Sequence, residues 1–217
     1  MKRVNILTRL KKCGVIAVVR GKSCEEAIKS CDALVEGGIV GLEVTFTIPQ
    51  AEKAIEALLD KYKNNSRVVI GAGTILDPAT ARLALNSGAQ YIVSPFFDQG
   101  TSELCNLYQI PYIPGCMTVT EIKTALSSGV DIVKLFPGNS FDPNIIFAIK
   151  APLPHINVMV TGGVNLENMG SWFETGATLV GIGGNLLAPA ELNNYDEITD
   201  KAKKYMSKFK SFKNVVE

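Results

Sequence analysis

Histidine is nearly absent from this chain of 217 residues, and its cysteines are not arranged for a metal. The one histidine, His155, follows two prolines in a predicted surface loop, and no two of the five cysteines have the close spacing of a zinc or redox motif. A catalytic zinc needs several His or Cys ligands. The sequence therefore predicts no metal site and no cofactor, although magnesium held by carboxylates is not excluded. We expect reduced cysteines that are mostly small core residues.

An excess of charge of one sign is also missing, as are long apolar runs. The 22 Lys and Arg residues and 21 Asp and Glu residues give a net charge of +1, which does not favour a nucleic-acid partner or a membrane surface. No apolar stretch approaches the roughly 20 residues of a membrane-spanning helix, and the basic N-terminus lacks the apolar run of a signal peptide. The sequence thus predicts a soluble, cytoplasmic protein with one domain over residues 1–217.

The chain does contain a regular alternation of short apolar runs and amphipathic segments. The apolar runs predict strands at residues 14–20, 40–46, 67–70, 90–94, 112–114, 131–136, 157–160 and 178–182. Helices are predicted between them, with further helices at 2–12 and 195–212. Ser23 with Glu26 and Thr118 with Glu121 have capping-box spacing, which indicates where two of these helices begin.

A weak internal repeat supports one particular fold class. Glycines recur where a helix ends before every second strand, at Gly38, Gly88, Gly129 and Gly176, and each predicts a left-handed helix cap. About eight β-α units in a chain of this length predict an α/β fold, a TIM (β/α)8 barrel with an extra N-terminal helix. A doubly wound open sheet is the alternative, but no Gly-x-Gly-x-x-Gly follows the first strand.

Lys134 is the most informative residue, because it lies in an otherwise apolar strand. Its neighbours are Ile132, Val133, Leu135 and Phe136. Burial of an ammonium group costs several kcal/mol unless the group is paired or neutral. A solvated edge-strand lysine is the ordinary alternative. A lysine near the end of a strand buried on both faces is instead a candidate amine nucleophile.

A barrel would bring polar side chains at the strand ends together, because active sites lie at the C-terminal ends of barrel strands. The strand-end polar residues are Arg20, Glu43, Thr45, Thr47, Thr74, Ser94, Lys134, Thr161 and Asn185. Glu43 has apolar neighbours and so needs a partner, unless it is an exposed strand carboxylate. A lysine and a glutamate in one barrel mouth can carry out amine–carbonyl chemistry, with the glutamate moving protons.

Two glycine pairs follow the last two predicted strands. Gly162-Gly163 and Gly183-Gly184 are each explained by a tight turn. In barrels, however, the loops after the seventh and eighth strands often hold a phosphate group on free backbone N–H groups. The sequence leaves both interpretations open.

Seven motifs together resemble the 2-keto-3-deoxy-6-phosphogluconate (KDPG) / 4-hydroxy-2-oxoglutarate (KHG) aldolase family, lysine-dependent class I barrel enzymes. They span nearly the whole chain in the expected order: GLEVT (41–45), GAGT (71–74), VSP (93–95), IPG (113–115), VKLFP (133–137), TGGV (161–164) and GIGG (181–184). The resemblance implies that the protein cleaves a 2-keto acid, one that carries a phosphate group. It also implies that the protein assembles as a homotrimer. It also implies that Lys134 forms the Schiff base and that Glu43 is the general acid and base.

The resemblance also assigns substrate contacts. Arg20 and Thr74 would help place the substrate carboxylate, beside walls formed by Pro95 and Phe136. The remaining implied substrate-binding residues are Thr47, Thr161 and, for the phosphate, Gly162, Gly163, Gly184 and Asn185.

Two positions depart from the family pattern. Many members have an arginine where this chain has Thr47, and a serine where it has Asn185. The first departure shifts carboxylate recognition toward Arg20, and the second leaves phosphate binding to backbone and amide donors. Two other functions stay open: a non-covalent isomerase or epimerase of sugar phosphates with Glu43 as base, and a non-catalytic metabolite-binding barrel with a Lys134–Glu43 ion pair.

Overall fold

The strands form a barrel with parallel pairing throughout. The computed structural model describes residues 1–216, and the side chains of residues 1–212. The nine strand segments have the order β5-β4-β3-β2-β1-β9-β8-β7-β6. They are β1 Val15–Val19, β2 Gly41–Thr45, β3 Val69–Gly73, β4 Ile92–Val93, β5 Tyr112–Ile113, β6 Gly115–Cys116, β7 Val133–Leu135, β8 Val158–Thr161 and β9 Leu179–Ile182.

Chain continuity at Pro114 closes the ring, since β5 and β6 flank this residue. Proline has no N–H to donate to a neighbouring strand, so the ladder is interrupted there. Gly115 N donates to Ser94 O at 2.9 Å, and Lys134 N donates to Pro114 O at 2.8 Å. These two bonds join β4 to β7 through a single broken strand. The nine segments therefore make eight barrel strands, and the predicted TIM-like barrel is confirmed.

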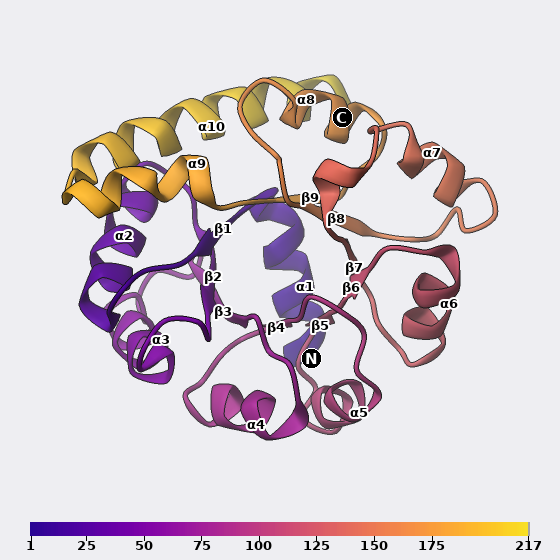
Figure 1. The fold of residues 1–217 in the computed structure, drawn as a ribbon, viewed down its shortest axis with the longest axis horizontal. Coiled ribbons are helices and arrows are strands. Elements are labelled where there is room, and N and C mark those ends of the chain that lie inside the picture. Colours follow the sequence, from indigo (N-terminus) through magenta and orange to yellow (C-terminus); the bar gives the residue numbers. More distant parts are fainter. Residues whose placement is uncertain (217) are drawn as a thin grey trace.

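Helices surround the strands (Figure 1). They are α2 Cys24–Glu36, α3 Ala51–Lys61, α4 Pro78–Asn86, α5 Gln99–Leu107, α6 Val119–Ser127, α7 Ile145–Lys150, α8 Met169–Glu174, α9 Gly184–Leu187 and α10 Tyr195–Val216, with 3-10 turns η1 Gly138–Ser140 and η2 Ala188–Leu192. The capping box of Thr118 and Glu121 is complete, whereas Ser23 accepts one bond from Glu26 N. No helix of the described residues is both long enough and apolar enough to cross a membrane.

The predicted glycine caps are present. Gly38, Gly88, Gly129 and Gly176 have φ angles of 97°, 90°, 85° and 97°, which only glycine adopts without strain. They precede β2, β4, β7 and β9, which are the second, fourth, sixth and eighth barrel strands. The fourfold repeat of paired units seen in the sequence is thus a repeat of backbone geometry.

The extra N-terminal helix, α1 Lys2–Cys13, covers the N-terminal end of the barrel and is seen behind the ring of strands in Figure 1. Its apolar residues Ile6, Leu10 and Cys13 are buried. The helix lies against residues just before β7, β8 and β9, among them Asp131, Asn157 and Thr178. One end of the barrel is therefore filled, and the other carries the strand C-termini.

The third strand differs from its predicted range of 67–70. Arg67 is exposed and belongs to a turn in which its N–H donates to Asn65 Oδ1 at 3.2 Å. The strand instead continues to Gly73, and its glycines pair with β2 at Glu43 and Thr45. Glycine usually weakens a strand, but here a missing side chain makes room inside the barrel.

Candidate active site

Lys134 and Glu43 meet inside the barrel from opposite walls. Lys134 is on β7 and Glu43 on β2, and three barrel strands separate them in either direction around the ring. The Lys134 Nζ atom lies 3.9 Å from Glu43 Oε1, and the two side chains are 6% and 1% exposed. This geometry removes the alternative of a solvated edge-strand lysine and that of an exposed glutamate.

The Glu43 carboxylate has no hydrogen-bond partner among the described residues. Both of its oxygens are buried and unpaired, and 3.9 Å to Lys134 Nζ is beyond hydrogen-bond range. Burial raises the pKa of Glu43 above its ordinary value, and the positive charges of Lys134 and Arg20 partly oppose that rise. A carboxyl group with a raised pKa holds a proton more readily than an exposed glutamate, which suits a group that both gives and accepts a proton.

Glycines in β3 make the position of Glu43 possible. A Cβ atom on Gly73 would overlap the Glu43 carboxylate, and a Cβ on Gly71 would come within 2.5 Å of the Tyr91 ring. Tyr91 is fully buried and donates to Leu42 O at 2.7 Å. Burial, followed by the charge of Glu43, raises the pKa of the Tyr91 phenol. Sequence reasoning missed both roles, since these glycines resemble an ordinary turn and Tyr91 an ordinary strand residue.

An aromatic ring contacts the amine. Lys134 Nζ lies 4.8 Å from the centroid of the Phe136 ring, two residues along the same segment. Phe136 is half-buried, so its ring forms part of the wall next to the amine, and its contact with substrate stays a prediction. Pro95 follows β4 along the chain and packs against Gly115. A Cβ atom on Gly115 would overlap the Pro95 carbonyl oxygen.

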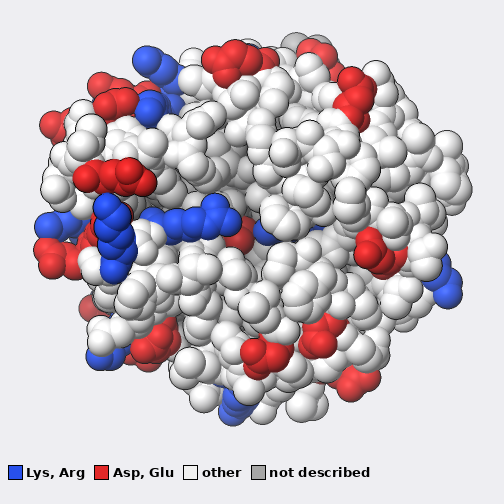
Figure 2. Space-filling view, viewed as in Figure 1, with Lys and Arg blue, Asp and Glu red and all other residues white. Residues whose placement is uncertain are grey.

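Arg20 follows β1 at the rim of the mouth, between the ends of β2 and β9. It is exposed at that position, and its positive charge acts on Glu43. Its Nη1 atom lies 3.5 Å from the point where a Cβ on Gly183 would lie. The guanidinium group therefore lies near both the carboxylate and the second glycine pair. In Figure 2 basic and acidic side chains meet at the centre of this face, within a surface that is otherwise largely uncharged.

Two threonines after β2 form a directed pair. Thr45 Oγ1 donates to Val19 O at 2.9 Å and lies 2.7 Å from Thr47 Oγ1. Thr45 has only one hydroxyl proton, so Thr47 must be the donor between the two. The exposed Thr47 hydroxyl is left with acceptor capacity and cannot take over the carboxylate binding of an arginine. Thr74, after β3, is half-buried with a left-handed φ of 57°.

The β8 end supplies a second unpaired polar atom. Thr161 Oγ1 is buried without a hydrogen-bond partner among the described residues. Thr161 is two residues beyond Met159, which pairs with Lys134, so its side chain is on the same face and one layer nearer the mouth. Gly162 and Gly163 follow with φ angles of 101° and 74° and pack against the segment Gly138-Asn139.

The β9 end is more open. A Cβ on Gly184 would meet no atom within 4 Å, so neither packing nor backbone conformation requires glycine there. Asn185 is exposed at the next position. Ser94, in contrast, is hydrogen-bonded to Tyr112 OH at 2.7 Å and to Phe96 O, which gives it a structural role. The structure thus brings Lys134, Glu43 and Arg20 together and removes Ser94 from the candidate residues.

The chain closely resembles known aldolases in sequence. Residues 6–201 match the family model described as KDPG and KHG aldolase. The chain is 36% identical to the 2-dehydro-3-deoxy-6-phosphogalactonate aldolase of Escherichia coli (strain K12), with 81% of this chain and 85% of that protein covered. It is 33% identical to the 2-dehydro-3-deoxy-phosphogluconate aldolase of Treponema pallidum (strain Nichols), with 87% and 88% covered.

Solved structures show the same fold. One similar structure is the KDPG aldolase from Legionella pneumophila, described as having pyruvate captured at low pH as a covalent carbinolamine intermediate. It has a TM-score of 0.81 and 28% sequence identity, with 94% of this chain and 97% of that chain covered.

Proposed function

The chain belongs to the KDPG and KHG aldolase family, and from this we propose that it is a class I aldolase acting through Lys134. The proposed reaction cleaves 2-keto-3-deoxy-6-phosphogluconate to pyruvate and glyceraldehyde 3-phosphate, and 4-hydroxy-2-oxoglutarate to pyruvate and glyoxylate. The observation that carries this proposal is the buried amine 3.9 Å from an unpaired buried carboxylate.

Lys134 acts as the nucleophile. Its neutral amine adds to the C2 ketone to give a carbinolamine, which loses water to form a cationic imine. The imine accepts the electron pair of the C3–C4 bond when that bond breaks. The aldehyde product leaves, and an enamine of pyruvate stays on the lysine.

Glu43 moves the protons of the same cycle. It removes the proton of the C4 hydroxyl as the C3–C4 bond breaks, and it returns a proton to C3 of the enamine. Hydrolysis of the resulting imine releases pyruvate and regenerates the amine. Burial raises the pKa of Glu43, which makes its protonated form easier to reach than in an exposed glutamate and supports this double role.

The two ends of the substrate have different surroundings in this proposal. Arg20 and Thr74 are assigned to the substrate carboxylate, and Thr161 with the Phe136 and Pro95 walls surrounds the rest of the pyruvate half. The phosphate is assigned to the open turns at Gly162, Gly163, Gly184 and Asn185. The space in front of Gly184 supports that assignment.

Trapping of the imine tests the covalent step. Pyruvate with borohydride should leave a reduced adduct on Lys134, identified by peptide mass, and Lys134→Ala should abolish both the adduct and turnover. An adduct on another lysine would overturn the residue assignment. Sugar-phosphate turnover without any adduct would favour a non-covalent isomerase, and pyruvate binding without cleavage would favour a binding protein.

A substrate panel tests the specificity. Pyruvate release should be measured with phosphorylated and unphosphorylated 2-keto-4-hydroxy acids. The panel should include 2-dehydro-3-deoxy-6-phosphogalactonate, the C4 epimer of the phosphogluconate substrate, because the relative with 36% identity is named for it. Preference for an unphosphorylated acid would remove the phosphate role of residues 184 and 185.

The assembly and location are proposals of the same kind. We propose a homotrimer in the cytoplasm, and exposed Phe96, Met117 and Val119 support an interface between copies, since they are 47%, 49% and 51% exposed. Sedimentation at equilibrium tests the trimer, and a monomer at micromolar concentration would overturn it.

A further inference from the structure

Three neighbouring grooves lie at the N-terminal end of the barrel, away from the mouth. Two of them run along α1 and share Asn5, Arg9 and Ser66, and the larger has a volume of about 420 Å³. The third shares Val40 and Arg67 with its neighbour and extends to α10. Together they form one continuous surface around the start of β3, which we call the basal groove.

The basal groove is lined by basic side chains. These are Arg9, Lys12, Lys63, Arg67, Lys203 and Lys210, and no Asp or Glu is among its described lining residues. Lys63 pairs with Asp60 and Lys203 with Asp200. The other four cations have no ion pair with the side chains of residues 1–212. For a protein with a net charge of +1, this is a concentrated excess of one sign.

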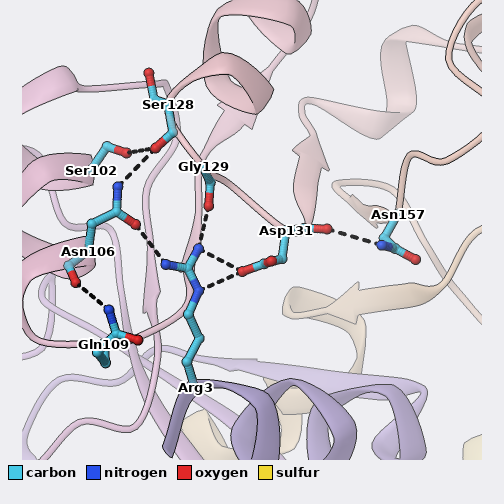
Figure 3. Close-up of polar contacts among 8 residues, drawn as sticks. All are labelled: Arg3, Ser102, Asn106, Gln109, Ser128, Gly129, Asp131 and Asn157. Carbon is cyan, nitrogen blue, oxygen red and sulfur yellow. Dashed lines mark hydrogen bonds and ion pairs between the residues drawn. The ribbon is translucent and has the colours of Figure 1, made fainter. Parts of the chain in front are cut away.

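Two arginines of α1 show what is unusual about this surface. Arg3 donates to Asp131 Oδ2 at 2.7 Å, to Asn106 Oδ1 at 2.7 Å and to Gly129 O (Figure 3). Its partners are themselves fixed, since Asn106 donates to Ser128 O at 2.9 Å. Arg3 is therefore a structural clamp with its own carboxylate, in which all three guanidinium nitrogens donate to the protein.

Arg9, six residues further along the same helix, lacks such a carboxylate. One nitrogen, Nη2, donates to Val68 O at 2.7 Å, while the buried Nε has no partner among the described residues. The side chain is half-buried, so water screens its charge incompletely. A half-buried guanidinium without a counter-charge, next to exposed Lys12 and Arg67, favours an anion.

We propose that the basal groove is a second binding site, for a small polyanion with two or more adjacent phosphate groups. Arginine guanidinium groups present paired donors that match phosphate oxygens. Asn5, Asn65 and Ser66 line the same grooves and add uncharged donors. A single phosphate would satisfy one cation, whereas the spread of cations across three adjoining grooves matches a longer anion.

This site is separate from the proposed catalytic centre and does not rest on it. Val68, the carbonyl partner of Arg9, lies five residues before Gly73, which contacts Glu43. At about 3.3 Å per strand residue, the two points are roughly 16 Å apart along β3. A ligand in the basal groove therefore cannot touch Lys134 or Glu43.

Calorimetric titration with inorganic pyrophosphate tests the site. The double variant Lys12→Gln/Arg67→Gln should weaken the Kd about tenfold or more, because each charge-assisted hydrogen bond contributes to binding. Both residues are exposed and without ion pairs in the described part of the chain, so folding should be unaffected. Arg9→Gln should weaken binding similarly, with its fold checked by circular dichroism.

Two matched substitutions serve as controls. Arg20→Gln makes the same change in the mouth, and Lys123→Gln removes an exposed cation on α6; neither should change the Kd. Weakening by Arg20→Gln alone would place the pyrophosphate in the mouth and overturn the proposal. Equal weakening by all variants would show unspecific charge attraction, and absence of binding at millimolar pyrophosphate would also overturn it.

Discussion

The two ends of the barrel differ in how their polar groups are satisfied. At the N-terminal end, Arg3 is matched by Asp131, Asn106 and a backbone carbonyl. At the C-terminal end, both oxygens of Glu43 and the hydroxyl of Thr161 are buried without partners among the described residues. Buried polar groups are almost always hydrogen-bonded in native proteins. The unpaired groups of the mouth belong to the surroundings of Lys134, and the unpaired Arg9 Nε at the other end belongs to the basal groove. Each identifies a place where stability has been given up, in contrast to Arg3.

The difference separates stabilising residues from reactive ones. The Arg3 clamp joins residues 128 positions apart in the sequence, and each of its three guanidinium nitrogens already donates to the protein. The Lys134–Glu43 pair, at 3.9 Å, is not joined by a hydrogen bond, so the amine and the carboxylate stay free to act on neighbouring atoms of one substrate. Changes at the mouth should therefore alter turnover, and changes at the clamp should alter stability.

Among changes that leave the lysine intact, the largest effect is expected from Glu43→Gln. Loss of the general acid and base should lower kcat by about 10²–10⁴-fold, while the imine on Lys134 still forms because the amine is intact. Stopped-flow turnover and borohydride trapping measure the two steps separately. A variant that lost trapping as completely as turnover would show that Glu43 positions the lysine instead of moving protons.

Gly73→Ala should have the next largest effect, although it removes no functional group. The added Cβ would overlap the Glu43 carboxylate and displace it. A displacement of about 1 Å can reduce a rate about 10²-fold. In a double-mutant cycle the alanine should cost almost nothing once Glu43 is already Gln, apart from any direct steric strain. Additive losses would mean that Gly73 acts on the fold and not through Glu43.

Arg3→Ala should lower stability and leave turnover unchanged, the opposite of the two changes at the mouth. Loss of the charge-assisted bonds to Asp131 and Asn106 should lower the free energy of unfolding by about 2–3 kcal/mol, with kcat unchanged in the folded protein. Urea denaturation and steady-state kinetics measure both quantities. Lys2→Ala, at an exposed position on the same helix, is the control and should change neither. A fall in kcat with stability intact would contradict the division between the two ends.

The sequence was sufficient for the barrel and for its central pair of residues. Apolar runs with glycine caps predicted the strands, and the apolar neighbours of Lys134 and Glu43 predicted that both would be buried. The glycine caps of the helices could be placed from the sequence because a left-handed helix end depends only on the local backbone. The substrate contacts assigned to Arg20, Thr47 and the glycine turns remain predictions, because they depend on a ligand.

Interactions between distant parts of the chain could not be read from the sequence. The Arg3 clamp, the fit of Glu43 against Gly73, and the unmatched charge of Arg9 each depend on which segments the barrel brings together. Arg3 and Arg9 are indistinguishable by pattern, since both are basic residues on an amphipathic helix. The same holds for Ser94, whose hydroxyl is taken by Tyr112.

The smallest effect is a pH dependence of stability that has opposite signs for two glutamates. Burial raises the pKa of Glu43 above 4.5, so its contribution is present below that pH and is lost as pH rises through the folded-state pKa. Hydrogen bonds from Met117 and Thr118 lower the pKa of Glu121, so its contribution is lost as pH falls. As pH rises above 4.5, the free energy of unfolding should therefore fall less steeply in Glu43→Gln than in the wild type. As pH rises toward 4.5 from below, the free energy of unfolding should rise less steeply in Glu121→Gln than in the wild type. If the curve of Glu43→Gln ran parallel to that of the wild type, the Glu43 carboxyl would have no raised pKa. The contrast between a destabilised carboxylate at the mouth and a satisfied ion pair at the other end would then be lost.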